Sequence, residues 1–427
     1  MEKSVDRLGM GPGQPGTFGA ALMFLRPFVL LFTVMVSALL SAQEVTVDRV
    51  MRVGLLRERT VKQVMVMPSK GVCTIYADGQ RKGEVSATDG LRIEVVAGRL
   101  TARSLNLNIS ASKQLEVIPA HANGHFRLRI PESKMAERTY HGGLQVTVAG
   151  GALQLVNRVP LEAYTAGVVE AEAGKEHHQE YYKLQAVSCR TYALTNQRKH
   201  QPEGFELCDG VHCQVYRGRT RNDSILMAVD ATHSLVLVDA DIRIIHATFH
   251  SNCGGETVNA EDLWSRSETY LRATTDTFCL ASPHATWQKT LSRSEWLSYL
   301  RKRYGLGESD SSQLEAVLNY EPQCRDLYLG NTWPLVPLKH VREDLKLRST
   351  FFSVKSTGEK VLLEGRGFGH GVGLCQEGAM RMALAGRSYT DILHHYFTDV
   401  HLVEMTTLDF FRDDAPAPSA PGGPKGR

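Results

Sequence analysis

The chain has 427 residues, of which 42 % are hydrophobic and 22 % are charged. These proportions are those of a globular protein, and they exclude a disordered chain, a disulfide-dense scaffold and a polytopic membrane protein. The 49 Lys and Arg residues nearly balance the 46 Asp and Glu residues, which leaves a formal charge of +3. A nucleic-acid-binding protein usually carries a larger basic excess to displace counterions from phosphates, so the composition argues against such a partner.

The N-terminal segment has the layout of an export signal. Lys3 and Arg7 precede an uncharged apolar run at residues 28–40, which is followed by small residues. This run is shorter than the roughly 20 residues that cross a bilayer, and its length fits the apolar core of a signal peptide. We predict that residues 1–42 are a signal peptide, or else an N-terminal anchor that begins near Gly19. In either case we expect the body of the chain to be exported, to the periplasm or another extracytoplasmic space where cysteines can pair.

The next region, residues 43–150, is predicted to be rich in β-sheet. Its short apolar and β-branched runs are separated by turn residues, which is typical of strands. The clearest of these runs are residues 51–55, 63–67, 91–96 and 144–148.

A proline at position 160 and a glycine at position 174 mark the two ends of a predicted helix. Leu161 and Val168 recur at helical spacing on its inner face, and Glu172 follows on the same face. Partial burial and the negative end of the helix dipole both disfavour an ionised Glu172, so its pKa should be raised, as a general acid requires. The alternative is a solvated side chain near a frayed helix end.

Further elements follow along residues 151–410. We predict helices at 178–198, near 294–304, at 376–385 and at 389–397, and strands at 235–238 and 242–250. No element is predicted between residue 305 and about residue 344, where the pattern is weak. Residues 411–427 carry several prolines and glycines and are expected to be a disordered tail. The predicted fold class is therefore α+β, with mixed sheets, a central pair of helices and a glycine-rich loop.

A group of cysteines and histidines lies shortly after the second predicted helix. Cys208, His212 and Cys213, with His200 before them, could hold Zn²⁺, which binds thiolates and imidazoles tetrahedrally. In an exported protein a disulfide competes with metal, for instance between Cys208 and Cys213 or from either to Cys253. Both alternatives remain open from the residues alone.

Two other segments could line a cleft. His250 precedes a turn with the sequence Cys-Gly-Gly, and His370 lies in a segment, residues 365–374, with five glycines. Such a density of glycine points to unusual backbone angles or to close approach by a ligand. The segment lacks the order and the lysine of a phosphate-binding loop, so a nucleotide is not the expected ligand. By spacing alone, Gln185 and Arg190 are ordinary surface residues of the second helix.

Five motifs, taken together and in this order, resemble the stage II sporulation protein D family, which includes the LytB amidase enhancers. They are residues 159–172, 183–193, 212–216, 251–257 and 365–379, and the resemblance spans roughly residues 51–402. The resemblance implies a lytic transglycosylase that cuts peptide-stripped glycan strands between N-acetylmuramic acid and N-acetylglucosamine, leaving 1,6-anhydro ends. The implied partner is peptidoglycan, and a cell-wall amidase is a further implied partner.

The resemblance also implies roles for individual residues. Glu172 takes the catalytic position, as a general acid and then a base, without the second carboxylate of ordinary glycosidases. The chemistry requires no cofactor, and a structural zinc would be held by His200, Cys208, His212 and Cys213. The residues expected around the glycan are Gln185, Arg190, His212, Gln214, Tyr216, His250, His370 and Gln376.

Two features leave other functions open. The family commonly has Glu-Met-Pro where this chain has Glu172, Ala173 and Gly174, and Met-Ser where it has Leu374 and Cys375. The alternative to an enzyme is a non-catalytic wall-binding protein that stimulates an amidase. A third reading is a hydrolase with a zinc-bound nucleophile.

Overall fold

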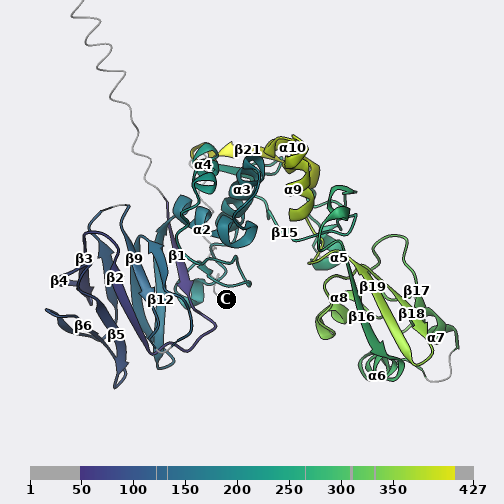
Figure 1. Cartoon of the computed structure of the whole chain (residues 1–427), viewed down its shortest axis with the longest axis horizontal. Helices are drawn as coiled ribbons and strands as arrows, with labels where there is room; N and C mark the ends of the chain where they lie inside the picture. The colour runs from purple at the N-terminus through teal and green to yellow at the C-terminus, as the bar shows by residue number, and fades with distance from the viewer. Residues whose placement is uncertain are drawn as a thin grey trace, which may run out of the picture. The chain divides into compact units, whose positions relative to one another are not determined.

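The computed structural model describes residues 49–408, except for residues 122, 132, 265, 308–310 and 331–332. The predicted signal peptide or anchor (1–42) and the predicted tail (411–427) lie outside the described residues. Among the helices of the described part, none combines the length and the apolar character that a membrane span needs. Helices and several sheets are mixed along the chain, which confirms the α+β prediction (Figure 1).

The N-terminal strands and β13 form two sheets that share one core, and all their strand pairs are antiparallel except β1 with β13, which is parallel. One sheet has seven strands in the order β13-β1-β12-β11-β8-β3-β4, and the other has six in the order β10-β9-β2-β5-β6-β7. Every second residue of strands such as β2 and β3 is buried, and these inward side chains join a common hydrophobic core. The strands are β1 (Val50–Leu55), β2 (Gln63–Pro68), β3 (Val72–Ala77), β4 (Gln80–Ser86), β5 (Leu91–Val96), β6 (Arg99–Arg103), β7 (Asn108–Ala111), β8 (Leu115–Pro119), β9 (His125–Arg129), β10 (Arg138–His141), β11 (Gly143–Ala149), β12 (Ala152–Pro160) and β13 (Leu207–Cys208).

Strand β12, the longest of these two sheets, continues directly into the first described helix. Strand β12 ends at Pro160 and α2 (Leu161–Ala173) begins at the next residue, because the fixed φ of proline suits the entry to a helix. The helix ends at Gly174, whose positive φ of 87° reverses the chain without the strain that a side chain would add. Both predicted ends of this helix are confirmed.

The second helix, α3 (Gln179–Thr195), is largely buried. It packs against α2, α4 (Asp223–Ala231), α9 (Gln376–Leu384) and α10 (Tyr389–Tyr396) (Figure 1). Gln185 and Arg190, which spacing alone placed on the surface, are both fully buried. That surface interpretation was wrong because the helix has neighbours on more than one face, which a single apolar stripe does not reveal.

A second hydrophobic core lies between residues 286 and 366, around a four-stranded antiparallel sheet of order β16-β19-β18-β17. Its elements are β16 (Thr286–Ser292), α6 (Arg293–Tyr304), α7 (Ser311–Leu318), β17 (Asn319–Tyr320), α8 (Leu338–Asp344), β18 (Phe352–Thr357) and β19 (Lys360–Arg366). Helix α6 confirms the helix expected near 294–304. The sequence pattern missed α7, β17 and α8, which are too short to show a clear period.

The remaining elements link the helices to the glycine-rich segment. Strand β14 (Leu235–Val238) pairs with β21 (His401–Glu404), and β15 (Phe249–His250) runs parallel to β20 (Leu374–Cys375). The strand expected at 242–250 is therefore mostly irregular, and its last two residues alone form β15. The other short elements are η1 (Gln201–Glu203), α5 (Ala260–Trp264) and η2 (Phe278–Ala281).

Candidate functional site

A cavity of about 570 Å³ lies beside the C-terminal end of α2. Its wall includes Glu172, the segment 211–215 that follows β13, and residues of β15 and α5. His370 from the glycine-rich segment also lines it. The structure thus brings together parts of the chain that are almost 200 positions apart, and it places Glu172 in the same cavity as His212, Gln214 and His370.

Glu172 is partly buried and makes one specific contact in this cavity. The backbone N–H of Val215 donates a hydrogen bond of 2.7 Å to its Oε1. Burial raises the pKa of Glu172, and the Val215 N–H and the positive charge of Arg217 only partly offset this effect. The neighbouring Glu170, by contrast, pairs with Lys175 at 3.7 Å. Of these two carboxyl groups of α2, Glu172 is the one whose environment favours a bound proton.

Gln214 lines the same cavity and carries a buried polar atom without a hydrogen-bond partner among the described residues. Its side chain is buried, and its Oε1 accepts a hydrogen bond of 3.3 Å from the hydroxyl of Tyr164. Its Nε2 is buried and has no hydrogen-bond partner among the described residues. A buried N–H without a partner is unfavourable, and an acceptor on a bound ligand would relieve that cost.

His370 forms a fixed, neutral part of the wall. The N–H of Val372 donates to its Nδ1 at 3.1 Å, so its Nε2 carries the hydrogen and donates to the carbonyl of Phe249 at 3.0 Å. Burial lowers the pKa of His370 to about 4. Because the backbone engages both ring nitrogens, His370 shapes the cavity and does not relay protons.

The cysteine and histidine group of the sequence is gathered into one cluster. One donor atom from each of His200, Cys208, His212 and Cys213 lies within 4.8 Å of the others. Nε2 of His200 is 3.3 Å from Nδ1 of His212 and 3.4 Å from Sγ of Cys213. The donors around a tetrahedral zinc are about 3.3 to 3.8 Å apart, and Sγ of Cys208 lies 4.0 Å from Nδ1 of His212, so a small side-chain adjustment would fit these four residues to one ion.

A carboxylate supports this cluster from outside. Oε1 of Glu203 lies 2.6 Å from Nδ1 of His200, which leaves Nε2 of that ring directed at the cluster. Such a carboxylate behind a ligating histidine is typical of zinc sites. Each of the eight cysteines of the chain is a free thiol in the structure.

Five of the residues expected around the glycan do not line this cavity. Arg190 is held by Glu162, whose carboxylate accepts from its Nε at 2.8 Å, and by the carbonyl of Leu235. Tyr216 is buried and donates to Oδ1 of Asn157 at 3.2 Å. Both side chains stabilise the packing of helices and sheet, because the resemblance of a motif gives no direction to a side chain.

The other three of these residues are buried close to the helices. Gln185 donates to the hydroxyl of Tyr181 at 3.2 Å, within α3. His250 lies next to His370, with ring centroids 5.3 Å apart, and is almost fully buried. Gln376 begins α9 and is also buried. None of the three lines the cavity.

Sequence reasoning missed several residues of the wall. Tyr192, Trp264, Arg266 and Glu268 all line the cavity. Arg266 and Glu268 form an ion pair of 2.8 Å, and the Trp264 ring lies 5.5 Å from the His370 ring. Tyr192 lies inside the second motif and could have been found there, whereas the other three occur in no motif and carry no periodic signal.

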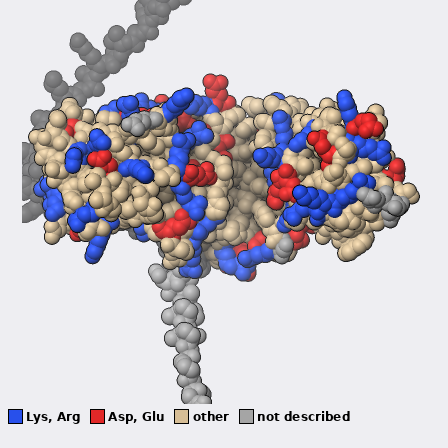
Figure 2. All heavy atoms as spheres, turned by 90° about the horizontal axis from the view of Figure 1, so that it is seen from below, with Lys and Arg blue, Asp and Glu red and all other residues tan. Residues whose placement is uncertain are grey.

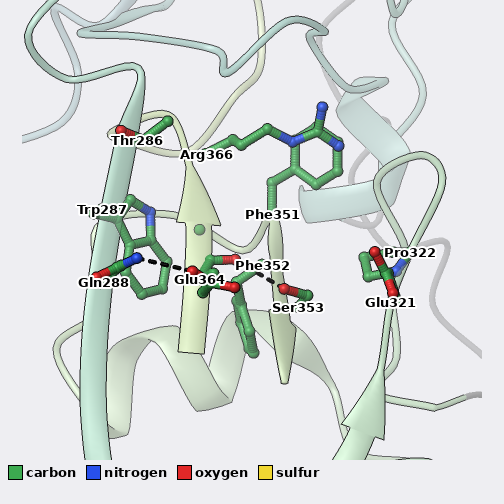
Figure 3. Close-up of a pocket in the computed structure, with 11 residues that line it drawn as sticks. Thr286, Trp287, Gln288, Glu321, Pro322, Phe351, Phe352, Ser353, Glu364 and Arg366 are labelled. Carbon is green, nitrogen blue, oxygen red and sulfur yellow. Dashed lines mark hydrogen bonds between the residues drawn. The ribbon is translucent and has the colours of Figure 1, made fainter. Parts of the chain in front are cut away.

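A larger cavity of about 670 Å³ occurs on the four-stranded sheet of the second core. Figure 3 shows Arg366 over the ring of Phe351 and a hydrogen bond between the side chains of Gln288 and Glu364. The guanidinium carbon of Arg366 lies 3.8 Å from the centroid of the Phe351 ring. Glu364 is exposed and already has an amide partner, so this cavity offers no buried acid comparable with Glu172. The cavity beside α2 is therefore the stronger candidate for chemistry.

The surface charge agrees with the near balance of the composition. Figure 2 shows Lys and Arg side chains interspersed with Asp and Glu side chains over the face in view. A surface of mixed sign does not favour a polyanion over an uncharged polymer.

Comparison with known proteins agrees with this arrangement of motifs. The family model "Stage II sporulation protein" (SpoIID) matches residues 149–238, which include Glu172 and the four residues of the cysteine and histidine cluster. Stage II sporulation protein D of Bacillus amyloliquefaciens is 30 % identical over 307 residues, which cover 68 % of this chain and 87 % of the relative. The chain belongs to the stage II sporulation protein D family.

Two further relatives show the breadth of the SpoIID family. Stage II sporulation protein D of Bacillus subtilis is 29 % identical over 290 residues, covering 64 % of this chain and 83 % of the relative. A protein named amidase enhancer, also from Bacillus subtilis, is 27 % identical over 290 residues, covering 54 % of this chain and 39 % of that protein. The family therefore includes proteins named for sporulation and for stimulation of an amidase.

Proposed function

We propose that this member of the SpoIID family is an exported lytic transglycosylase that cleaves the glycan strands of peptidoglycan. The observation that supports this most directly is Glu172, a carboxyl group with a raised pKa in the wall of a cavity. A group that holds its proton in a cleft large enough for sugar rings is suited to general acid catalysis.

Glu172 would transfer one proton in each direction. In its protonated form it donates to the glycosidic oxygen between N-acetylmuramic acid and N-acetylglucosamine, and the bond from that oxygen to C1 breaks. The carboxylate then accepts the proton of the muramyl 6-hydroxyl as that oxygen closes on C1. The product is a 1,6-anhydro end, no water is consumed, and Glu172 regains its initial protonation state.

Other residues of the cavity would bind and orient the sugars. The side chain of Gln214 lines the cavity, and a small rotation would bring its unpartnered Nε2 to an acetamido carbonyl or a hydroxyl of the glycan. The Trp264 side chain is 43 % exposed and borders the cavity, where its ring can pack against the apolar face of a sugar. The N–H of Val215 holds Oε1 of Glu172, so the other carboxyl oxygen is directed to the proton transfer.

We also propose that His200, Cys208, His212 and Cys213 hold a structural zinc ion. Such an ion supplies cross-linking of the chain, and it takes no part in the proposed proton transfers. The last two ligands directly precede Gln214 and Val215, which line the same cavity as Glu172, and the N–H of Val215 bonds to Glu172. Glu203 orients His200 for this role.

Digestion of purified glycan strands tests the enzyme proposal. Peptide-free strands are incubated with the full-length protein, and the ends are identified by mass spectrometry. We expect anhydro-muramyl ends from the wild type and from Glu170→Gln, the matched control on the same helix, and at least a 1000-fold lower rate from Glu172→Gln, an order-of-magnitude estimate for loss of a general acid. Undiminished cleavage by Glu172→Gln, or no anhydro ends from the wild type, overturns the proposal.

A second function is favoured by the relative named amidase enhancer. On this alternative the chain binds the wall and stimulates an amidase without cutting glycan. Stimulation of a purified amidase that is unchanged in Glu172→Gln, together with no anhydro ends, supports this alternative. A hydrolase that used a zinc-bound nucleophile would instead release reducing ends and would stop when the metal is chelated.

A further inference from the structure

A second group of potential metal ligands lies behind the glycine-rich segment. It consists of Cys253, Asp276, Cys279 and Cys375, all with 0 % exposure. Cys253 follows β15, and Cys375 ends β20. Asp276 lies just before η2, and Cys279 lies within it. One donor atom from each of the four lies within 4.8 Å of the others.

The distances within the group suit a single tetrahedral ion. Sγ of Cys253 lies 3.4 Å from Sγ of Cys279 and 3.3 Å from Oδ2 of Asp276. Zinc bonds of about 2.3 Å to sulfur and about 2.0 Å to oxygen separate tetrahedral donors by about 3.3 to 3.8 Å. Thiolate ligands together with one carboxylate are a donor set that zinc accepts, and hard cations such as Mg²⁺ do not prefer it.

Backbone and side-chain groups around the four residues favour anionic donors. The N–H groups of Cys253 and Gly378 donate to Sγ of Cys375 at 3.3 and 3.4 Å. Cys375 also caps the N-terminus of α9, where the helix dipole stabilises negative charge. The hydroxyl of Tyr396 donates to Oδ2 of Asp276 at 2.8 Å, as a supporting group does for a ligating carboxylate.

The packing around the four residues also keeps other side chains away from them. A Cβ atom placed on Gly378 would lie 2.1 Å from Oδ2 of Asp276, so a side chain at this position would displace the carboxylate. The guanidinium of the half-buried Arg325 donates a hydrogen bond to the carbonyl of Cys253 and brings a positive charge near the group. These features keep a buried carboxylate and three thiols together at one point.

We propose that Cys253, Asp276, Cys279 and Cys375 bind a zinc ion, so that the chain holds two structural zinc ions when it is fully loaded. Each thiol releases its proton to solvent on binding. A disulfide between Cys253 and Cys279 is the competing outcome. It would leave the Cys375 thiol and the Asp276 carboxylate buried without a cation, whereas an ion engages all four groups.

The proposed ion would fix the wall of the α2 cavity from behind. His250 pairs with Cys375 in the register of β15 and β20, and His250 contacts His370. The ion would tie this strand pair to η2 and to the start of α9. It would therefore hold the glycine-rich segment in place without contacting the cavity.

Metal stoichiometry of the full-length chain, purified without a histidine tag and dialysed, tests this site independently of catalysis. We expect two zinc ions per chain in the wild type and in Cys324→Ser, the control at an exposed cysteine outside both groups. We expect one in Cys375→Ser, one in Cys208→Ser and none in the double variant. Two ions retained by Cys375→Ser and by Cys279→Ser overturn the proposal.

A thiol measurement on the wild type keeps the test valid if the variants fail to fold. The protein is denatured with chelator and an alkylating reagent, and each cysteine is then assigned by mass spectrometry. We expect all eight cysteines to be alkylated. A mass lower by two hydrogens in a peptide joining Cys253 and Cys279, with one zinc per chain, shows the disulfide and rejects the second site, while leaving the first untouched.

Discussion

The N–H of Val215 donates to Oε1 of Glu172 at 2.7 Å. This bond joins the end of α2 to the short segment that follows Cys213, the last of the proposed zinc ligands. The bond favours the carboxylate, whereas burial favours the protonated acid and prevails, so the pKa of Glu172 is raised. A carboxyl group balanced in this way can donate a proton and accept one later in the same cycle. Loss of either influence should therefore be visible in the pH dependence of activity and of stability.

We predict that Glu172→Gln stabilises the fold at neutral pH. A raised pKa in the folded state means that folding favours protonated Glu172, so its contribution to stability is present at low pH and is lost as pH rises through the folded pKa. The amide still accepts from Val215 but never ionises. Chemical denaturation should show a larger unfolding free energy for the variant than for the wild type at pH 7 to 8, and this difference should become smaller toward pH 4. A difference in unfolding free energy that grows at low pH contradicts the prediction.

The same shift predicts how activity depends on pH. Cleavage requires protonated Glu172, so the rate should fall as pH rises through its pKa, which burial raises above the ordinary value for a glutamate. The other ionisable groups that line the cavity are Tyr192, His212, Cys213, His246, Arg266, Glu268 and His370, and the charge of Arg217 also acts on Glu172. Profiles of kcat/KM measured with and without Val215→Ala, which keeps the N–H, should have the same alkaline limb. If activity instead increases as pH rises through the pKa of Glu172, then Glu172 is not the general acid.

We predict that Trp264 contributes to binding of glycan. Removing an aromatic ring that packs on a sugar should cost about 0.5 to 1.5 kcal/mol, or roughly a 2- to 10-fold higher KM for glycan strands. Trp264→Ala is compared with Trp333→Ala, since Trp333 is 78 % exposed and outside this cavity. Equal KM values for the two variants would show that the sugar does not pack on Trp264.

We predict that Arg190 is required for stability. Its guanidinium is fully buried and bound to Glu162 through two nitrogens, so Arg190→Ala leaves a carboxylate without its partner. Breaking such a pair costs about 3 to 5 kcal/mol. Arg81→Ala, which breaks the exposed pair with Glu84, should stay within about 1 kcal/mol. Unfolding in denaturant measures the stability of both variants. If Arg190→Ala is as stable as the wild type but inactive, Arg190 acts in substrate binding and not in stability.

We predict that Glu203 strengthens the zinc site of His200. Glu203→Gln weakens the support of Nδ1 and should lower zinc affinity by about 10- to 100-fold. Competition with a chromophoric chelator measures this affinity. Glu206→Gln is the matched control, because Glu206 accepts from the N–H of Arg52 and does not contact the cluster. An unchanged affinity in Glu203→Gln means that the histidine needs no such support.

Local signals predicted the parts of the fold that depend on neighbours in sequence. The proline and glycine at the ends of α2 defined that helix, and the position of Glu172 on its inner face predicted a raised pKa. The directions of Arg190 and Tyr216 could not be predicted, since each depends on a partner far along the chain, Glu162 or Asn157. Trp264 reaches the cavity wall through tertiary packing alone, and a motif search has no means to find it.

The direct passage from β12 to α2 has a mechanical consequence. Because Pro160 ends the strand and Leu161 begins the helix, no hinge separates the paired sheets from the acid at the far end of α2. We expect a pull or a twist applied to the sheets to be transmitted along the helix axis to Glu172. Anchoring of the N-terminal sheets to a surface would thereby set the angle at which a polymer meets the acid.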